Sequence, residues 1–342
     1  MSGPQYLDTA ASRARRHAKE RRRRGRRRLA LLSGSLAVVL LLGVLVAKAG
    51  DGDDGTRDPA QLGRADPQSV PERPPSQEAL GPLPADADVS DPTDAFTIPF
   101  KKPPRAGIVV NVDTGEVLWR RNPERTLPIA SLTKMMTARV TAELLEPDDR
   151  ARITPAVLRY TGSGVGVLPK NKRVKVEPLL HGLMLPSGND AARALAFRAA
   201  GSISGMVRRM NTRAAEMGLR CTRFAGVEGL SPGNRSCALD LVALARQVLR
   251  TKRIARIVRK RSAILPFPIK GGKLYLYNHN PLLRMRYRGT LGIKTGYTSE
   301  AGRCLVAAVR RDGATLVAVV LHSPDPGRQA RKLLDAGFRA VL

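Results

Sequence analysis

A stretch of nineteen residues without a charged side chain, residues 29–47, most constrains how this chain can fold. At about 1.5 Å per residue, a helix of that length spans about 28 Å, which matches the hydrocarbon core of a bilayer. A dense basic run at residues 13–28 precedes it, and positive charge on this flank holds that end of a membrane helix in the cytoplasm. The sequence therefore predicts a basic cytoplasmic segment (1–28), a transmembrane helix (29–47) and an extracellular remainder.

A cleaved signal peptide is the alternative interpretation of the same segment. Ala47, Lys48 and Ala49 place small residues at the spacing of a cleavage site, and cleavage there would yield a secreted protein. The apolar stretch is long for a signal peptide, so a retained anchor is favoured. Both interpretations put the bulk of the chain outside the cytoplasm, which argues against a nucleic-acid partner for its basic part.

Charge divides the rest of the chain into two zones, within a formal net charge of +30. Residues 51–95 carry 11 acidic and 3 basic residues and are rich in Pro, Asp and Gly, so residues 48–95 are predicted to form a disordered acidic linker. Residues 96–342 carry 44 basic and 16 acidic residues. This zone is large enough for a folded domain, and its charge indicates either an anionic polymer or lipid surface as a neighbour, or a solvated arginine-rich surface.

Apolar patterning within residues 96–342 predicts strands at both ends and helices between them. The first two strands, 106–112 and 116–119, flank the turn residues Asp113-Thr114-Gly115. Helical spacing follows at residues 131–145, 179–185, 190–200, 206–217 and 239–249. Later strand patterns cover 263–269, 274–277, 291–295, 303–310 and 315–321, before a closing helix at 327–342. We therefore expect an α/β fold of the α+β type, with an antiparallel sheet built from both ends of the domain, flanking helices and a helical insert.

Three short motifs lie on this framework. They are Ser131-Leu132-Thr133-Lys134 at a predicted helix start, Ser187-Gly188-Asn189 between two predicted helices, and Lys294-Thr295-Gly296 at the end of a predicted strand. Each alone is common by chance and is compatible with an ordinary helix cap, loop or strand end. Their combination, order and structural contexts together indicate one catalytic site.

The residue types suit acyl transfer to a serine. Ser131 and Lys134, at positions i and i+3, share a helix face, and a neutral lysine can act as the base that a serine nucleophile needs. Burial and the positive charge of Lys294 would lower the pKa of Lys134 and so favour the neutral amine. The backbone N–H of Ser131, at a helix start, can supply half of an oxyanion hole.

The other motif residues have roles in the same reaction. Ser187 can relay a proton to a leaving amine, and Asn189 can hydrogen-bond to the Lys134 amine or to a substrate amide. Lys294 and Thr295 offer a cation and a hydroxyl to a substrate carboxylate, and Gly296 lets the strand edge approach an extended peptide closely.

Competing chemistries lack their residues. The four histidines, His17, His181, His279 and His322, lie outside any G-x-S-x-G context. The sequence contains no His/Cys/Asp/Glu cluster with metal-ligand spacing, no Walker A loop and no dinucleotide fingerprint. We therefore expect neither a metal nor a cofactor.

Longer stretches extend the similarity beyond the triplets. They are DTGEVLW, PIASLTKMMTA, LLHGLMLPSGNDAARALA, MNTRAAEMGL, GIKTGYTSEAGRCLVAAVRRDG and GRQARKLLDAGF. With the three motifs, they make residues 103–342 resemble the serine D-alanyl-D-alanine carboxypeptidases, the low-molecular-mass penicillin-binding proteins. The resemblance implies that residues 96–342 form a penicillin-binding DD-peptidase domain.

The resemblance also implies a reaction. Ser131 would form an acyl-enzyme with a peptidoglycan stem peptide, release its terminal D-Ala, and be blocked covalently by β-lactams. The second oxyanion N–H would fall on Tyr297, and Arg328 matches a family arginine near the substrate carboxylate. The anionic neighbour would then be a wall polymer.

Other activities on the same fold stay open. A DD-transpeptidase or DD-endopeptidase would differ only in the acyl acceptor or the amide cleaved. A class A β-lactamase is less favoured, because that family has Asp where this chain has Gly188. A non-catalytic wall-binding protein is also less favoured, because Ser131, Lys134, Ser187 and Lys294 are all intact.

Three departures or open points remain. The family's Asn-Pro-x-Gly-Leu loop is replaced here by residues 225–230 (AGVEGL), and Arg303 stands where an aromatic residue or His is usual. Outside the cytoplasm a disulfide is permitted, so Cys221 and Cys237 either pair or, with Cys304, are three small buried residues.

Overall fold

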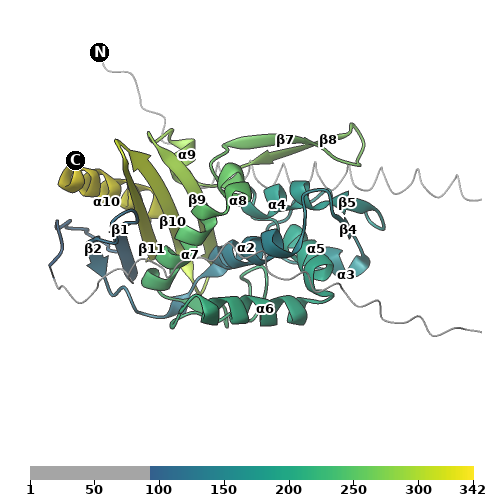
Figure 1. Ribbon diagram of the computed structural model, residues 1–342, viewed down its shortest axis with the longest axis horizontal. Helices are drawn as coiled ribbons and strands as arrows, with labels where there is room; N and C mark the ends of the chain where they lie inside the picture. The colour runs from purple at the N-terminus through teal and green to yellow at the C-terminus, as the bar shows by residue number, and fades with distance from the viewer. Residues whose placement is uncertain (1–92) are drawn as a thin grey trace, which may run out of the picture. The chain divides into compact units, whose positions relative to one another are not determined.

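The computed structural model describes residues 93–342 (Figure 1). At its centre is a five-stranded antiparallel sheet in the order β2-β1-β11-β10-β9. Its strands are β1 (Ala106–Asn111), β2 (Val117–Arg121), β9 (Thr290–Thr298), β10 (Gly302–Arg311) and β11 (Ala314–Ser323). The register pairs Ile108 of β1 with Val319 of β11, so the first strand of the domain lies beside the last. The antiparallel sheet built from both ends of the domain is therefore confirmed.

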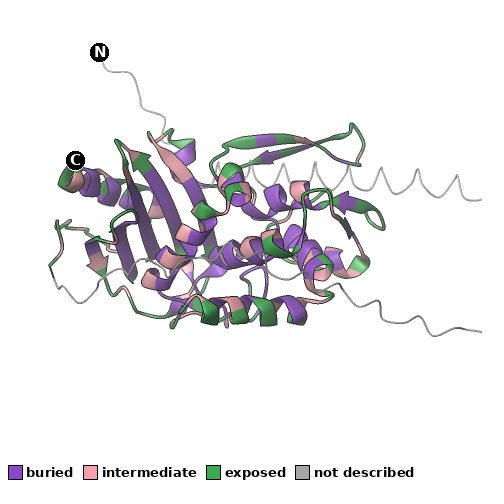
Figure 2. Ribbon diagram, in the orientation of Figure 1, coloured by how far each residue is buried: buried purple, intermediate pink, exposed green. Residues whose placement is uncertain are grey.

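Both faces of this sheet are covered, which explains why its inner strands, β1, β11 and β10, consist almost entirely of apolar residues. Helix α10 (Pro326–Val341) packs on one face with an apolar stripe of Ala330, Leu333, Leu334 and Phe338. The helical part of the molecule packs on the other face, against side chains such as Ile108, Val306 and Val317. The strands of the central sheet are buried along much of their length (Figure 2).

The helical part is arranged around helix α2 (Lys134–Leu144), whose first turns are buried. A short 3-10 turn, η1 (Ala130–Thr133), leads into α2 and lies against β9. Around α2 are α4 (Val176–Met184), α5 (Asn189–Ala200), α6 (Ile203–Glu216), α7 (Ala238–Arg250) and α8 (Lys252–Val258). The short helices are α3 (Pro155–Leu158) and α9 (Pro281–Arg284).

Three small sheets lie outside the central one. The strand patterns at 263–269 and 274–277 form a separate hairpin of β7 (Ser262–Pro266) and β8 (Lys273–Tyr277). The other two sheets pair β3 (Leu127–Pro128) with β6 (Arg235–Ser236), and β4 (Arg150–Arg152) with β5 (Arg173–Lys175). The four strands of these other two sheets have two or three residues each, too few to show an alternating pattern, and they were not predicted from the sequence.

Two residues before the expected domain start already contact the fold, because Asp94 pairs with Arg120 and the backbone N–H of Ala95 donates to Leu118 O. The expected cytoplasmic segment, membrane helix and most of the linker lie outside the described residues. Within residues 93–342, no helix combines the length and apolar character that crossing a membrane requires.

Candidate active site

Ser131 and Lys134 face each other at the start of α2. Ser131 lies in the 3-10 turn and Lys134 is the first residue of the α-helix, and the Nζ of Lys134 lies 2.9 Å from the Oγ of Ser131. The spacing of three residues brings the two side chains to one face, as the sequence predicts. The arrangement puts an amine within hydrogen-bonding distance of the hydroxyl proton.

Lys134 is fully buried in the protein interior. Burial lowers the pKa of its amine well below the usual value, and the positive charge of Lys294 lowers it further. The negative charges of Glu228 and Asp190 act in the opposite direction. Desolvation is the largest of these effects, so the net shift is toward the neutral form of the amine.

The hydrogen-bond partners of Lys134 suit a neutral amine. Its Nζ donates to the Oδ1 of Asn189 at 2.7 Å and to the backbone carbonyl of Glu228 at 2.5 Å. Both oxygens can only accept, so they take the two N–H groups of an uncharged amine. The Ser131 hydroxyl donates to the same Glu228 carbonyl at 3.4 Å, so proton transfer to Lys134 requires this hydroxyl to turn toward the lone pair of the amine.

Asn189 is the first residue of α5, and hydrogen bonds hold both its side chain and its backbone in place. Its Nδ2 donates to Thr161 O at 2.6 Å, and its backbone N–H donates to Ser163 O at 2.8 Å. These bonds orient Oδ1 toward Lys134. Nearby, the Ser187 hydroxyl is buried, and none of the residues described here bonds to it.

Strand β9 forms the opposite wall. Lys294 is buried, which lowers its pKa to about 7, and its Nζ donates to Thr295 O at 2.9 Å. A methyl group at Gly296 would lie 2.9 Å from Ile129 O and 3.1 Å from Ser131 N, so only glycine lets β9 approach the nucleophile this closely. Tyr297 follows at the strand edge, and two thirds of its surface is exposed.

The loop between α6 and α7 supplies a part of the site that the sequence analysis missed. The backbone carbonyl of Glu228 comes from this loop, and the side-chain carboxylate of Glu228 pairs with Arg193 at 3.1 Å. Gly229 has φ +95°, and a side chain there would collide with Ala130 O. A backbone carbonyl leaves no residue-type signal, although the conformation of Gly229 explains why glycine follows Glu228.

A disulfide between Cys221 and Cys237 closes this loop, with Cα atoms 5.5 Å apart. Asp240 lies close to both sulfurs, but two bridged cysteines have no thiolate to offer a metal ion. Cys304 is a free, buried cysteine on β10, opposite Gly296. Burial raises the pKa of its thiol to about 11, so it is unreactive.

The structure brings the residues of the three motifs to one place, but it leaves Arg328 apart. Arg328 lies in the first turn of α10 with an exposed side chain, 3.5 Å from the carboxylate of Asp325. No contact links it to Lys294 or Thr295 within residues 93–342, so its role stays a prediction. The pKa of His279 is lowered by burial and by the charge of Lys294.

Comparisons with known proteins agree with this geometry. The family described as D-alanyl-D-alanine carboxypeptidase matches residues 101–325. The D-alanyl-D-alanine carboxypeptidase DacF of Bacillus subtilis is 32% identical over 68% of this chain and 62% of its own length. DacB2 of Mycobacterium tuberculosis, which bears the same description, is 34% identical over 74% of this chain and 88% of its own.

A solved structure gives the same result for the fold. A mutant of the Streptomyces K15 DD-transpeptidase superposes with a TM-score of 0.66 and 31% identity, covering 70% of this chain and all of that one. The matched region contains all three motifs and the strands that carry them. The chain belongs to the D-alanyl-D-alanine carboxypeptidase family.

Proposed function

We propose that this protein is a serine DD-carboxypeptidase that removes the terminal D-Ala from peptidoglycan stem peptides. The observation that carries the proposal is the contact of the Ser131 hydroxyl with a buried lysine whose pKa is lowered. A serine with such a base is prepared for acyl transfer. The family and its named relatives supply the substrate class.

In the first step, the amine of Lys134 takes the proton of Ser131 as Oγ attacks the carbonyl carbon of the penultimate D-Ala. The backbone N–H groups of Ser131 and Tyr297 stabilise the resulting oxyanion. The C–N bond then breaks, Ser187 relays the proton held by Lys134 to the leaving amine, and the terminal D-Ala leaves. The protonated form of Lys294, with Thr295, holds the substrate carboxylate.

In the second step, water attacks the ester on Ser131 and frees the shortened peptide. An amine in place of water would give a transpeptidase, and attack on a cross-link amide would make the enzyme an endopeptidase. A β-lactam would acylate the same Oγ, since its strained amide takes the place of the scissile bond.

A labelled penicillin tests the nucleophile. We expect a covalent adduct on the native protein and none on Ser131→Ala. Ser204→Ala, which changes an exposed serine on α6, serves as the matched control and should label normally. An equal adduct on Ser131→Ala would refute the assignment.

A muramyl pentapeptide substrate tests the reaction. Free D-Ala in equal amount to tetrapeptide supports carboxypeptidase activity. Dimeric peptide would instead indicate a transpeptidase, and cleavage of a purified cross-linked dimer without D-Ala release would indicate an endopeptidase.

We further propose that residues 29–47 anchor the enzyme in the membrane, with the catalytic domain outside and the acidic segment 48–95 as a tether. The length of the uncharged stretch and the basic run before it support this topology. Intact mass of the protein from the membrane fraction is the test. A mature protein that begins after Ala49 would show a cleaved signal peptide instead.

A further inference from the structure

A group of cations on the small sheet β4–β5 lies outside the active site. The register pairs Arg150 with Lys175 and Arg152 with Arg173, and all four side chains are exposed. Only the central pair of this sheet, Ala151 and Val174, is buried. Like charges directly opposite each other destabilise a pair of strands, so stability alone does not explain these residues.

Nearby acidic residues do not neutralise the pair of Arg152 and Arg173. Asp148 is bound to Lys175 at 2.6 Å, and Asp149 is bound to Arg198 at 3.0 Å. Among residues 93–342, neither Arg152 nor Arg173 has an ion pair or a side-chain hydrogen bond. Two guanidinium groups on neighbouring strands are thus left without an anion.

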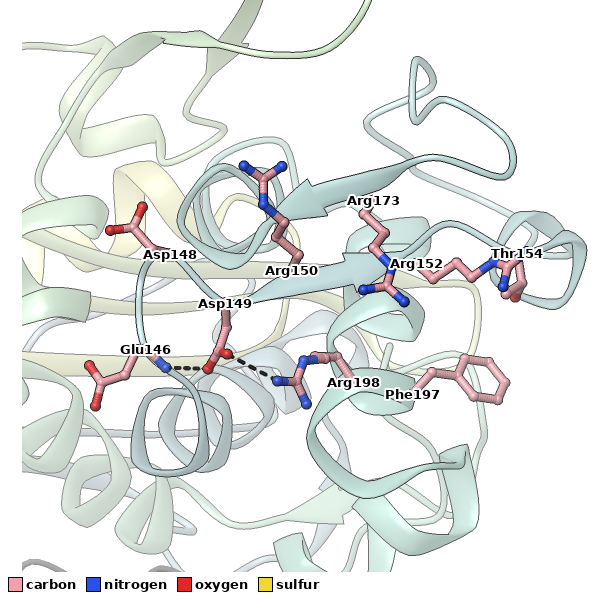
Figure 3. A pocket seen from close by; sticks show the side chains of 9 residues that line it. All are labelled: Glu146, Asp148, Asp149, Arg150, Arg152, Thr154, Arg173, Phe197 and Arg198. Carbon is pink, nitrogen blue, oxygen red and sulfur yellow. Dashed lines mark hydrogen bonds and ion pairs between the residues drawn. The ribbon is translucent and has the colours of Figure 1, made fainter. Parts of the chain in front are cut away.

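The same arginines line an open pocket (Figure 3). Arg152 and Arg173 come from β4 and β5, and Arg198 comes from the last turn of α5. Phe197, Thr154 and Arg150 also line the pocket, together with three acidic residues, Glu146, Asp148 and Asp149. None of the residues of the three catalytic motifs does, so this pocket is distinct from the active site.

We propose that this pocket binds the phosphate groups of a water-soluble phosphodiester polymer through Arg152 and Arg173. Guanidinium groups donate two parallel hydrogen bonds to an oxyanion. A phosphodiester has two charged oxygens, so neighbouring guanidinium groups can bind one phosphate together or bind successive phosphates along the polymer.

The lining of the pocket favours a soluble polymer over a lipid surface. Its single large apolar side chain is Phe197, which is half-buried. Large exposed apolar side chains that could insert into a bilayer gather elsewhere, at Ile264, Tyr275 and Tyr277 on the β7–β8 hairpin. The pocket is also open to solvent rather than enclosed, so a chain can extend past it.

Two elements connect this pocket to the active site. Helix α5 begins at Asn189 and ends beside Arg198, so the pocket lies about 13 Å along the helix from the catalytic amide. The segment between β4 and β5 passes the same amide, where Thr161 O accepts from Asn189 Nδ2. A bound polymer would therefore hold the enzyme on an anionic matrix with its active site close by.

Titration calorimetry of the full chain with poly(glycerol phosphate) at low salt tests the proposal. Replacing both arginines, Arg152→Ala with Arg173→Ala, should weaken binding by about tenfold or more, as expected for the loss of charge-assisted hydrogen bonds. The matched control is Arg208→Ala with Arg209→Ala, which removes the same charge from two exposed arginines on α6. The control should change binding by less than about twofold, because the contact is local.

Equal weakening in both double variants would overturn the proposal, because it would show binding to net charge alone. The proposal would also be overturned if the protein bound vesicles of anionic lipid more strongly than the polymer and lost that binding in the Arg152→Ala, Arg173→Ala variant. The pocket would then bind membranes. Full competition by millimolar inorganic phosphate would show that a single phosphate suffices, and the polymer assignment would fail.

A charge reversal gives a second, independent readout. Arg173→Glu places a carboxylate opposite Arg152, so it should abolish polymer binding while raising the unfolding temperature by about 1–3 °C. A lower unfolding temperature would contradict the like-charge argument. Penicillin acylation should be unchanged in every variant, which keeps this test separate from that of the proposed function.

Discussion

The backbone carbonyl of Glu228 accepts a hydrogen bond from the Nζ of Lys134, although 94 positions separate the two residues. The carbonyl therefore helps to orient the base at the nucleophile. It stands on a loop that the Cys221–Cys237 disulfide closes across 16 positions. The disulfide thus restrains one of the three groups that accept hydrogen bonds from the catalytic amine.

Reducing this disulfide should lower both stability and activity. Closing a loop of about 15 residues stabilises a protein by about 3 kcal/mol, so Cys221→Ser with Cys237→Ser should lower the free energy of unfolding by about that amount. The penicillin acylation rate should fall because the Glu228 carbonyl loses its fixed position. Urea denaturation and acylation kinetics, with and without reductant, measure the two effects.

Cys304→Ala is the control for this experiment. Its thiol is buried and free, so this variant should keep the sensitivity to reductant. If the native protein acylates at the same rate after complete reduction, the loop does not depend on the disulfide. Intact mass before and after reduction checks that the bridge forms at all.

Asn189→Asp should shift the pH dependence of acylation upward. The substitution puts a carboxylate where Oδ1 now lies 2.7 Å from the Lys134 amine. An adjacent negative charge favours the ammonium form and raises the pKa of Lys134. Acylation should then need a higher pH, with a rate at pH 7 reduced by about tenfold or more. An unshifted profile with a lower plateau would mean that Asn189 only positions the substrate.

Sequence reasoning reached the parts of this site that side-chain type and spacing encode. The helical register placed Lys134 beside Ser131, and the turn residues Asp113-Thr114-Gly115 predicted the β1–β2 hairpin. Lys294 was expected to influence Lys134, and it lowers the pKa of that residue. These features depend on local patterns, which a sequence displays directly.

The features that escaped prediction depend on chain geometry over long distances. The Glu228 carbonyl acts through its backbone, and the residue type does not determine where a carbonyl points. The two-stranded sheet β4–β5 has three residues in each strand, too few for a visible period. Its cationic pairs become evident only when the register is known, because 20 positions separate the two strands along the chain.

Gly229→Ala should abolish acylation and destabilise the fold. A methyl group there would collide with the carbonyl of Ala130, directly before the nucleophile, and the backbone would have to keep φ +95°. Gly313→Ala is the matched control, because Gly313 has φ +88° and open space around it. The control should cost only the left-handed backbone strain, about 1–2 kcal/mol, and should keep its acylation rate. Thermal unfolding and penicillin labelling measure the loss of stability and of acylation in both variants. Equal losses in the two variants would exclude a special role for the loop.

The buried amine of Lys294 should make the folded state more stable as pH rises above 7. Burial lowers its pKa from 10.5 to about 7, so between these values the folded protein has released a proton that the unfolded chain still holds. The free energy of unfolding then rises with pH, by up to about 1.4 kcal/mol per unit for this group. Lys294→Met removes this contribution, so urea denaturation should show the native protein gaining stability relative to the variant from pH 7 to pH 10. Parallel curves over that range would mean that the amine is hydrated and keeps its ordinary pKa.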